Sequence, residues 1–277
     1  MKPEIMWPDQ KQSCAMICVM LDAEYIWLAM DKDQYDTPKH RSMGEYGPKR
    51  GVDRILSILD EFHVKATFFT PAVFAEDYKD VLDHIVSCGH EIALHGYYHE
   101  TFSHLSDDMQ KQILESGRRV LQKAAGQKIC GFRLPEGECT ENTLKLIADT
   151  GFSYDNSFFD HDIPYVRHYE CGSSIVEIPQ RWEMIDFPYF AWGGTFPKGG
   201  DRIAIYDEVL DIWLRELDAS YNRGYCYVFS VTPQTIGSPG RMFMLRTMLQ
   251  QITRKNIWVA TGKEIADYIS TLGQVII

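Results

Sequence analysis

Short apolar runs of strand length alternate with longer segments of helical period along most of this chain, and this alternation restricts the possible folds. Residues 14–21 are continuously apolar, as expected for a strand buried on both faces. Further strands are predicted at 64–69, 91–94, 129–133, 175–178, 225–231 and 257–259. Amphipathic helices are predicted between them, at 52–62, 78–86, 106–125, 140–151, 209–217, 244–252 and from 263 onward.

This pattern predicts an α/β protein with a parallel sheet, in the form of a barrel of seven or eight βα units. An open doubly wound sheet is the competing topology, although no G-x-G-x-x-G sequence opens any of the helices. Linkers and repeats are lacking, so residues 1–277 are expected to form a single domain. The polar segment 31–50 is too long for an ordinary βα connection and is expected to cover or line something.

Charge and composition exclude several classes of partner. The formal net charge of −11 disfavours nucleic acid and anionic membrane surfaces, which attract clustered Lys and Arg. Apolar runs of membrane-spanning length and the features of a signal peptide are both missing. The seven cysteines are scattered without a C-x-x-C pair and are expected to be reduced. A cytoplasmic protein is therefore predicted.

Reactive side chains follow the ends of several predicted strands. His95 and His99, four residues apart, are expected to share one side of a helical turn, unless both are ordinary structural histidines. Asp22, Arg133 and Thr232 also lie just past strand ends, which converge on one face of a barrel. Asp22 with the two histidines would bind a divalent metal, with zinc favoured and cobalt, nickel or manganese as alternatives. Water bound to such an ion becomes a usable nucleophile.

Seven short stretches, which form six motifs in order along the chain, carry a resemblance to a known family. They include D-A-E at 22–24, A-T-F-F at 66–69, G-H-E at 89–91, H-G-Y-Y-H-E at 95–100, G-F-R-L-P-E-G at 131–137, G-F-S-Y-D-N-S at 151–157 and T-P-Q-T-I-G at 232–237. With these stretches the chain resembles the polysaccharide deacetylase superfamily (NodB homology, carbohydrate esterase family 4) over nearly its whole length. It is most similar to the branch with Helicobacter-type peptidoglycan deacetylases and allantoinase- or imidase-like cyclic amide hydrolases.

The resemblance implies a deformed (β/α)7 barrel and assigns roles to individual residues. Asp22, His95 and His99 are implied to be the metal ligands. Arg133 looks like the arginine that orients a catalytic carboxylate, and Asp155 like the acidic residue of the next motif. A structural ion pair between Arg133 and Asp155 is the alternative.

Two departures from the family pattern concern proton transfer. Relatives commonly read D-x-D-A-E, whereas Met20 occupies the first position here and cannot accept a proton. Glu24 and Glu136 are the candidate replacement bases; alternatively, Asp22 is itself the base and the ion has fewer protein ligands. Thr232 stands where relatives carry the histidine that acts as general acid, and a hydroxyl cannot act as an acid of pKa near 7.

The predicted activity is metal-dependent hydrolysis of a non-peptide amide bond. Both an N-acetyl amino sugar and a small cyclic amide or imide remain possible substrates, and the missing histidine favours the second. A degenerate member that binds a ligand or partner without turnover is the alternative. Apolar residues at 187–190 and Trp192 could wall the pocket. Together with Tyr165 they also motivate the prediction of a homo-oligomer, a dimer or tetramer.

Overall fold

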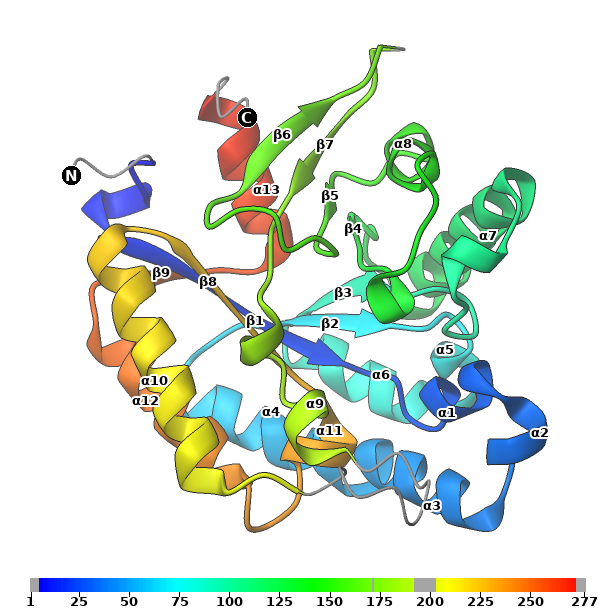
Figure 1. Cartoon of the computed structure of the whole chain (residues 1–277), viewed down its shortest axis with the longest axis horizontal. Coiled ribbons are helices and arrows are strands. Elements are labelled where there is room, and N and C mark those ends of the chain that lie inside the picture. The colour runs from blue at the N-terminus through cyan, green and yellow to red at the C-terminus, as the bar shows by residue number, and fades with distance from the viewer. Residues whose placement is uncertain (1–4, 171, 192–202, 273–277) are drawn as a thin grey trace.

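The backbone curls around one sheet of nine strands (Figure 1). The computed structural model describes residues 5–170, 172–191 and 203–272. The strands are β1 Ser13–Met20, β2 Thr67–Thr70, β3 Glu91–Leu94, β4 Gly131–Phe132, β5 Tyr154–Asp155, β6 Tyr165–His168, β7 Ser174–Glu177, β8 Cys226–Val231 and β9 Ile257–Val259. Their order is β6-β7-β5-β4-β3-β2-β1-β8, with β9 also paired to β1. All the pairings are parallel except β6 with β7.

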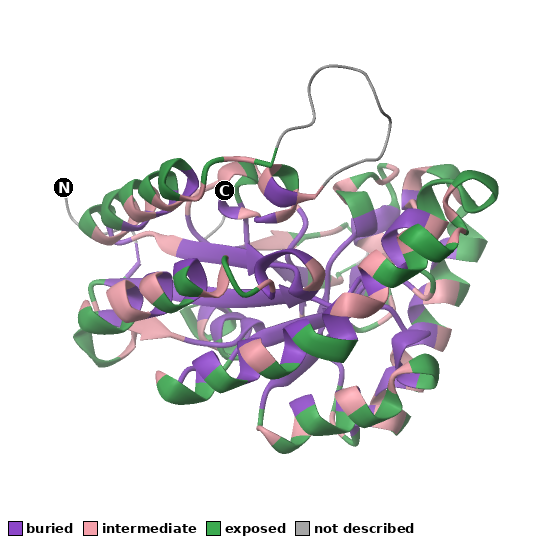
Figure 2. Ribbon diagram, turned by 90° about the horizontal axis from the view of Figure 1, so that it is seen from below, coloured by how far each residue is buried: buried purple, intermediate pink, exposed green. Residues whose placement is uncertain are grey.

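Helices cover the outside of this curved sheet. They are α1 Tyr25–Met30, α2 Lys32–Tyr35, α3 Pro38–Tyr46, α4 Val52–Glu61, α5 Phe74–Asp77, α6 Lys79–Ser87, α7 Asp107–Ala125, α8 Thr143–Asp149, α9 Phe187–Phe190, α10 Tyr206–Arg223, α11 Pro233–Ile236, α12 Met242–Arg254 and α13 Gly262–Leu272. Figure 2 shows their exposed outer faces around a buried sheet. The predicted α/β class and deformed barrel are confirmed.

Strand β1 is buried on both faces, as its unbroken apolar run predicts. Ala15, Ile17 and Val19 belong to the larger core cluster, which includes the buried faces of the helices. Met16 and Cys18, on the opposite face, pack in the smaller cluster with residues of other strands. Because side chains alternate along a strand, one segment joins both cores. It also fixes the position of Asp22, just beyond its carboxyl end.

Three local predictions need correction. The strand predicted at 129–133 is only the two residues of β4. Helix α8 begins at Thr143, three residues later than the cap predicted at Thr140; the amide of Thr140 instead donates to Oγ1 of Thr143 at 2.9 Å. Between the predicted helices 140–151 and 209–217 only the strand 175–178 is predicted, but the structure also contains β5, β6 and α9 there. Short strands leave too few alternating positions to be recognised by period.

The polar segment 31–50 forms α2, α3 and the start of a π-helical turn, Gly47–Gly51. Two glycines, one inside the segment and one directly after it, explain its close packing. A Cβ atom on Gly44 would lie 2.3 Å from Cα of Glu24, and one on Gly51 would lie 2.2 Å from the carbonyl oxygen of Pro233. The segment therefore packs against the chain that follows β1 and against the start of α11, which agrees with the expected covering role.

The apolar residues that motivated the oligomer prediction are largely packed within this chain. Tyr165 and Phe190 are buried, and the ring of Tyr189 lies 6.3 Å from that of Trp213. Phe187 and Pro188 line the pocket described below, as predicted, while Trp192 lies outside the described residues. Because these side chains are packed within the chain, most of the reason for predicting an oligomer is removed. The oligomer stays a prediction. Across the described ranges, we find no helix long and apolar enough to cross a membrane.

Candidate active site

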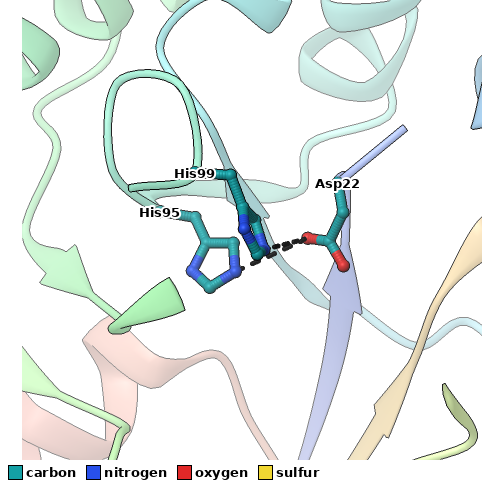
Figure 3. Close-up of side chains that lie close together, drawn as sticks. All are labelled: Asp22, His95 and His99. Carbon is teal, nitrogen blue, oxygen red and sulfur yellow. Dashed lines mark ion pairs between the residues drawn. The ribbon is translucent and has the colours of Figure 1, made fainter. Parts of the chain in front are cut away.

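Three buried side chains meet beyond the carboxyl ends of β1 and β3 (Figure 3). The Nε2 atoms of His95 and His99 lie 3.5 and 3.8 Å from Oδ1 of Asp22. One candidate ligand atom from each residue lies within 4.8 Å of the other two. Oδ1 of Asp22 is buried and has no hydrogen-bond partner among the described residues. Two imidazoles around an unsatisfied carboxylate oxygen fit the ligand set of a divalent cation.

The histidine pair lies in a loop, which corrects the predicted helical turn. Gly96 has φ +73° and His99 has φ 67°, so the segment after β3 cannot form an α-helix. Two further residues have a left-handed backbone conformation: Ala23 (φ 45°) in the loop after β1 and Glu136 (φ 57°) in the loop after β4. Three non-glycine residues with this costly backbone conformation surround one site, which is typical of functional loops.

The protonation states of the ligands are set mainly by burial. Burial lowers the pKa of His99 to about 4 and that of His95 well below its usual value, so both imidazoles are neutral at pH 7. Nδ1 of His95 donates to the carbonyl oxygen of Arg133 at 2.7 Å, which leaves its Nε2 unprotonated and facing Asp22. Ligating histidines usually have such an acceptor, but Nδ1 of His99 has none among the described residues.

The guanidinium of Arg133 is held by residues from three strand ends. Its Nη1 donates to Oδ1 of Asn156 at 3.1 Å and to Oγ of Ser230 at 2.8 Å, and its Nη2 donates to Oε1 of Gln180. No ion pair forms with Asp155 or with any other described carboxylate, so the structural ion pair considered from the sequence is absent. Asn156, Gln180 and Ser230 were not singled out from the sequence, although each lies at or near the end of a strand.

Asp155 is fully buried and lies beside a second carboxyl group. Its oxygens accept hydrogen bonds from the hydroxyl and amide of Ser157, at 2.9 and 3.0 Å. Its register partner across β5 and β7 is Glu177, which is also fully buried. Burial is the main reason why the pKa of Asp155 is raised to about 6. Burial also raises the pKa of Glu177 well above its usual value, and the negative charge of Asp155 raises it further. The two groups therefore titrate as a pair.

This pair predicts a pH-dependent stability. Because both pKa values are raised in the folded state, protonation stabilises the fold at low pH, and this contribution is lost as the pH rises above about 6. Glu177→Gln keeps an acceptor for the amide of Phe158 but removes the charge. We expect the free energy of unfolding, measured with urea, to rise by about 2 kcal/mol at pH 8 and by less than about 1 kcal/mol at pH 5. The exposed Glu170→Gln is the control; an equal change in the free energy of unfolding at both pH values would contradict the account.

The two candidate replacement bases lie in different places. The carboxylate of Glu24 accepts from the Tyr78 hydroxyl, 2.9 Å from each oxygen, and lines a separate cavity of about 600 Å³ with Tyr98. Glu136 lines the same cavity as Asp22 and lies at its exposed rim. The surrounding protein removes part of the water around its carboxyl group and so raises the pKa of that group. Its charge also helps to raise the pKa of Asp22 to about 8, after the larger effect of burial. Geometry thus brings Glu136, and not Glu24, together with the ligand set.

Thr232 closes the far end of this cavity, whose volume is about 190 Å³. Its amide donates to Oδ1 of Asp186 at 2.9 Å, and the hydroxyl of Thr235 donates to Oδ2 of the same carboxylate. Asp186 is fully buried and positions the loop after β8. Nothing in the sequence singles it out, because it lies outside the predicted strands and helices. The remaining walls are mostly apolar and include the stacked rings of Phe159 and Trp182.

A curved α/β barrel whose reactive groups collect at the carboxyl ends of its strands is the arrangement of many barrel hydrolases. Comparison with known proteins identifies the family. A profile described as Polysaccharide deacetylase matches residues 43–154. The peptidoglycan deacetylase of Helicobacter pylori is 26% identical over 276 residues, covering 90% of this chain and 93% of the relative.

Solved structures agree with this assignment. A Mycobacterium smegmatis protein assigned to the polysaccharide deacetylases is 34% identical, with a TM-score of 0.92 over 99% of this chain and 95% of that one. PuuE allantoinase shares the fold at 21% identity and a TM-score of 0.82, over 96% of this chain and 92% of that one. The chain belongs to the polysaccharide deacetylase family, whose members hydrolyse carbon–nitrogen bonds, and the predicted resemblance is confirmed.

Proposed function

We propose that the protein is a metal-dependent hydrolase that cleaves an amide bond in a small N-acetylated or cyclic substrate. The observation that carries the proposal is the buried cluster of Asp22, His95 and His99 around an unsatisfied carboxylate oxygen. A divalent ion bound there, with zinc favoured, would polarise the amide carbonyl and lower the pKa of water toward 7. We also propose that the whole chain acts as one catalytic domain, because its single sheet supplies every residue of the cluster.

Side chains around the cluster supply the proton transfer and the orientation. Glu136 is the carboxylate of the cavity that is not a proposed ligand, and its raised pKa suits a group that accepts a proton from water. Arg133 orients His95 through its carbonyl oxygen and is itself one of the residues that line the cavity. Thr232 can donate a hydrogen bond to the departing nitrogen but has no proton of suitable pKa to give.

The shape of the cavity favours a small substrate. At roughly 30 Å³ per water molecule, a cavity of about 190 Å³ has room for one small ring. Apolar side chains and few polar groups are typical of small-molecule sites. A cyclic imide also needs no general acid at the position of Thr232, because the nitrogen of an acidic imide leaves without prior protonation.

A screen against N-acetylglucosamine oligomers, allantoin, hydantoin and succinimide tests the proposal. We expect hydrolysis of at least one compound, abolished by a chelator and restored by zinc. Glu136→Gln should lower the turnover number by about 10²–10⁴-fold while metal content stays unchanged. Glu24→Gln is the matched control, since its carboxylate lies in the other cavity. Metal binding without hydrolysis of any compound would favour a degenerate member that binds a ligand without turnover.

A further inference from the structure

The guanidinium of Arg133 is a buried positive charge without a nearby negative partner. The residue is 5% exposed, and all three of its hydrogen-bond acceptors are uncharged groups of Asn156, Gln180 and Ser230. Arginine stays protonated in proteins, and buried charges are normally paired. None of the described carboxylates lies within ion-pair distance of Arg133, although the charges of Asp22 and Asp155 act on it from farther away. An anion is therefore expected beside this group when the protein works.

The guanidinium lies beside the cavity in which the substrate would bind, because its acceptor Gln180 lines that cavity. Arg133 and Met20 also line it, together with the proposed metal ligands. A guanidinium has five N–H groups; three donate to Asn156, Ser230 and Gln180, and the thiol of Cys18 interacts with a further one. At least one N–H group is left for an oxygen of a ligand carboxylate, a group with which guanidinium pairs well.

We propose that the natural substrate carries a carboxylate that binds Arg133 while its amide lies at the Asp22–His95–His99 cluster. This inference rests on the proposed function and specifies its substrate as an acidic small amide. Met20 offers a way to test it without disturbing Arg133. It lines the cavity, its register partner is Phe69, and the Arg133 guanidinium lies 5.8 Å from the centre of the Phe69 ring. Met20→Asp therefore places a carboxylate of the chain itself near the guanidinium.

Two pairs of a neutral and an acidic compound provide the probes. Dihydroorotate differs from dihydrouracil by one carboxylate, and N-acetylmuramic acid differs from N-acetylglucosamine by a lactyl ether that carries one carboxylate. On metal-stripped protein, calorimetry should show that the acidic member of at least one pair binds about tenfold tighter or more than the neutral member. Met20→Asp should reduce this ratio to near one, whereas Met20→Leu should retain it. On metal-loaded protein the same preference should appear in kcat/KM.

The possible results separate this inference from the proposed function. Equal binding of both members in both pairs, or a preference that survives Met20→Asp, would overturn the carboxylate assignment. If hydrolysis of neutral amides is as fast as that of acidic ones and Arg133→Lys lowers kcat for both equally, Arg133 stabilises the transition state and the inference is wrong. An acid preference in binding without any hydrolysis by metal-loaded protein would support the inference and contradict the proposed function.

Discussion

Replacing His95 with alanine is expected to strip the divalent ion from the protein. His95 contributes one of the two imidazoles next to Asp22, and its ring orientation is fixed by its bond to the Arg133 carbonyl. Loss of a group that only orients a ligand costs about 10–100-fold in metal affinity, so loss of a ligand itself should cost more than about 100-fold. Metal content after dialysis, measured by mass spectrometry, should fall from one ion per chain to near zero.

The matched control is His104→Ala, because His104 is exposed and lines the separate cavity with Glu24. This variant should bind the same amount of metal as the wild type. Circular dichroism should confirm that both variants are folded before metal is measured. If His95→Ala retains a full equivalent of metal, the proposed ligand set is incorrect.

Replacing Thr232 with histidine is expected to separate the two substrate classes. Thr232 lines the cavity beside the cluster, and the carboxylate of Asp186 fixes its backbone. A histidine there could protonate the departing amine of an N-acetyl sugar, so turnover of that substrate should rise by about 10²–10⁴-fold, or roughly 3–5 kcal/mol of barrier. Turnover of a cyclic imide should stay flat or fall, because its nitrogen gains little from an acid and the larger side chain crowds the cavity.

Thr232→Gln is the control for size, since glutamine fills similar space without titrating near neutral pH. An equal increase with glutamine would show that the effect is not acid catalysis. If Thr232→His changes neither activity while Met20→Asp creates deacetylation, the limiting deficiency is the base, and the emphasis on Thr232 is wrong.

The elements that the sequence predicts well are those with enough residues to show a period. Strand β3 matches its predicted bounds, and Ser106 caps α7 as expected, with its hydroxyl accepting from the amide of Met109. Two-residue strands such as β4 and β5 carry no period, and their pairing is decided by neighbours far away in the chain. The helices within 31–50 are polar and short, so their packing against other loops cannot be read locally.

The candidate site shows the same division. Placing Asp22, His95 and Thr232 at strand ends was enough to predict that they lie near one another. The sequence could not predict that His99 and Glu136 adopt left-handed backbone conformations, because these depend on the loops around them. Nor could it show that Glu24 faces a different cavity from Asp22, or that Arg133 has only uncharged partners; both require the three-dimensional packing of side chains.

The central claim is that one divalent ion at this cluster drives amide hydrolysis. The most direct measurement titrates metal-stripped protein with zinc and follows hydrolysis of the best substrate from the panel. We predict that the rate rises from near zero in proportion to added zinc and levels off at one ion per chain. Full hydrolysis by the metal-stripped protein, or no hydrolysis after one equivalent has bound, would contradict the account.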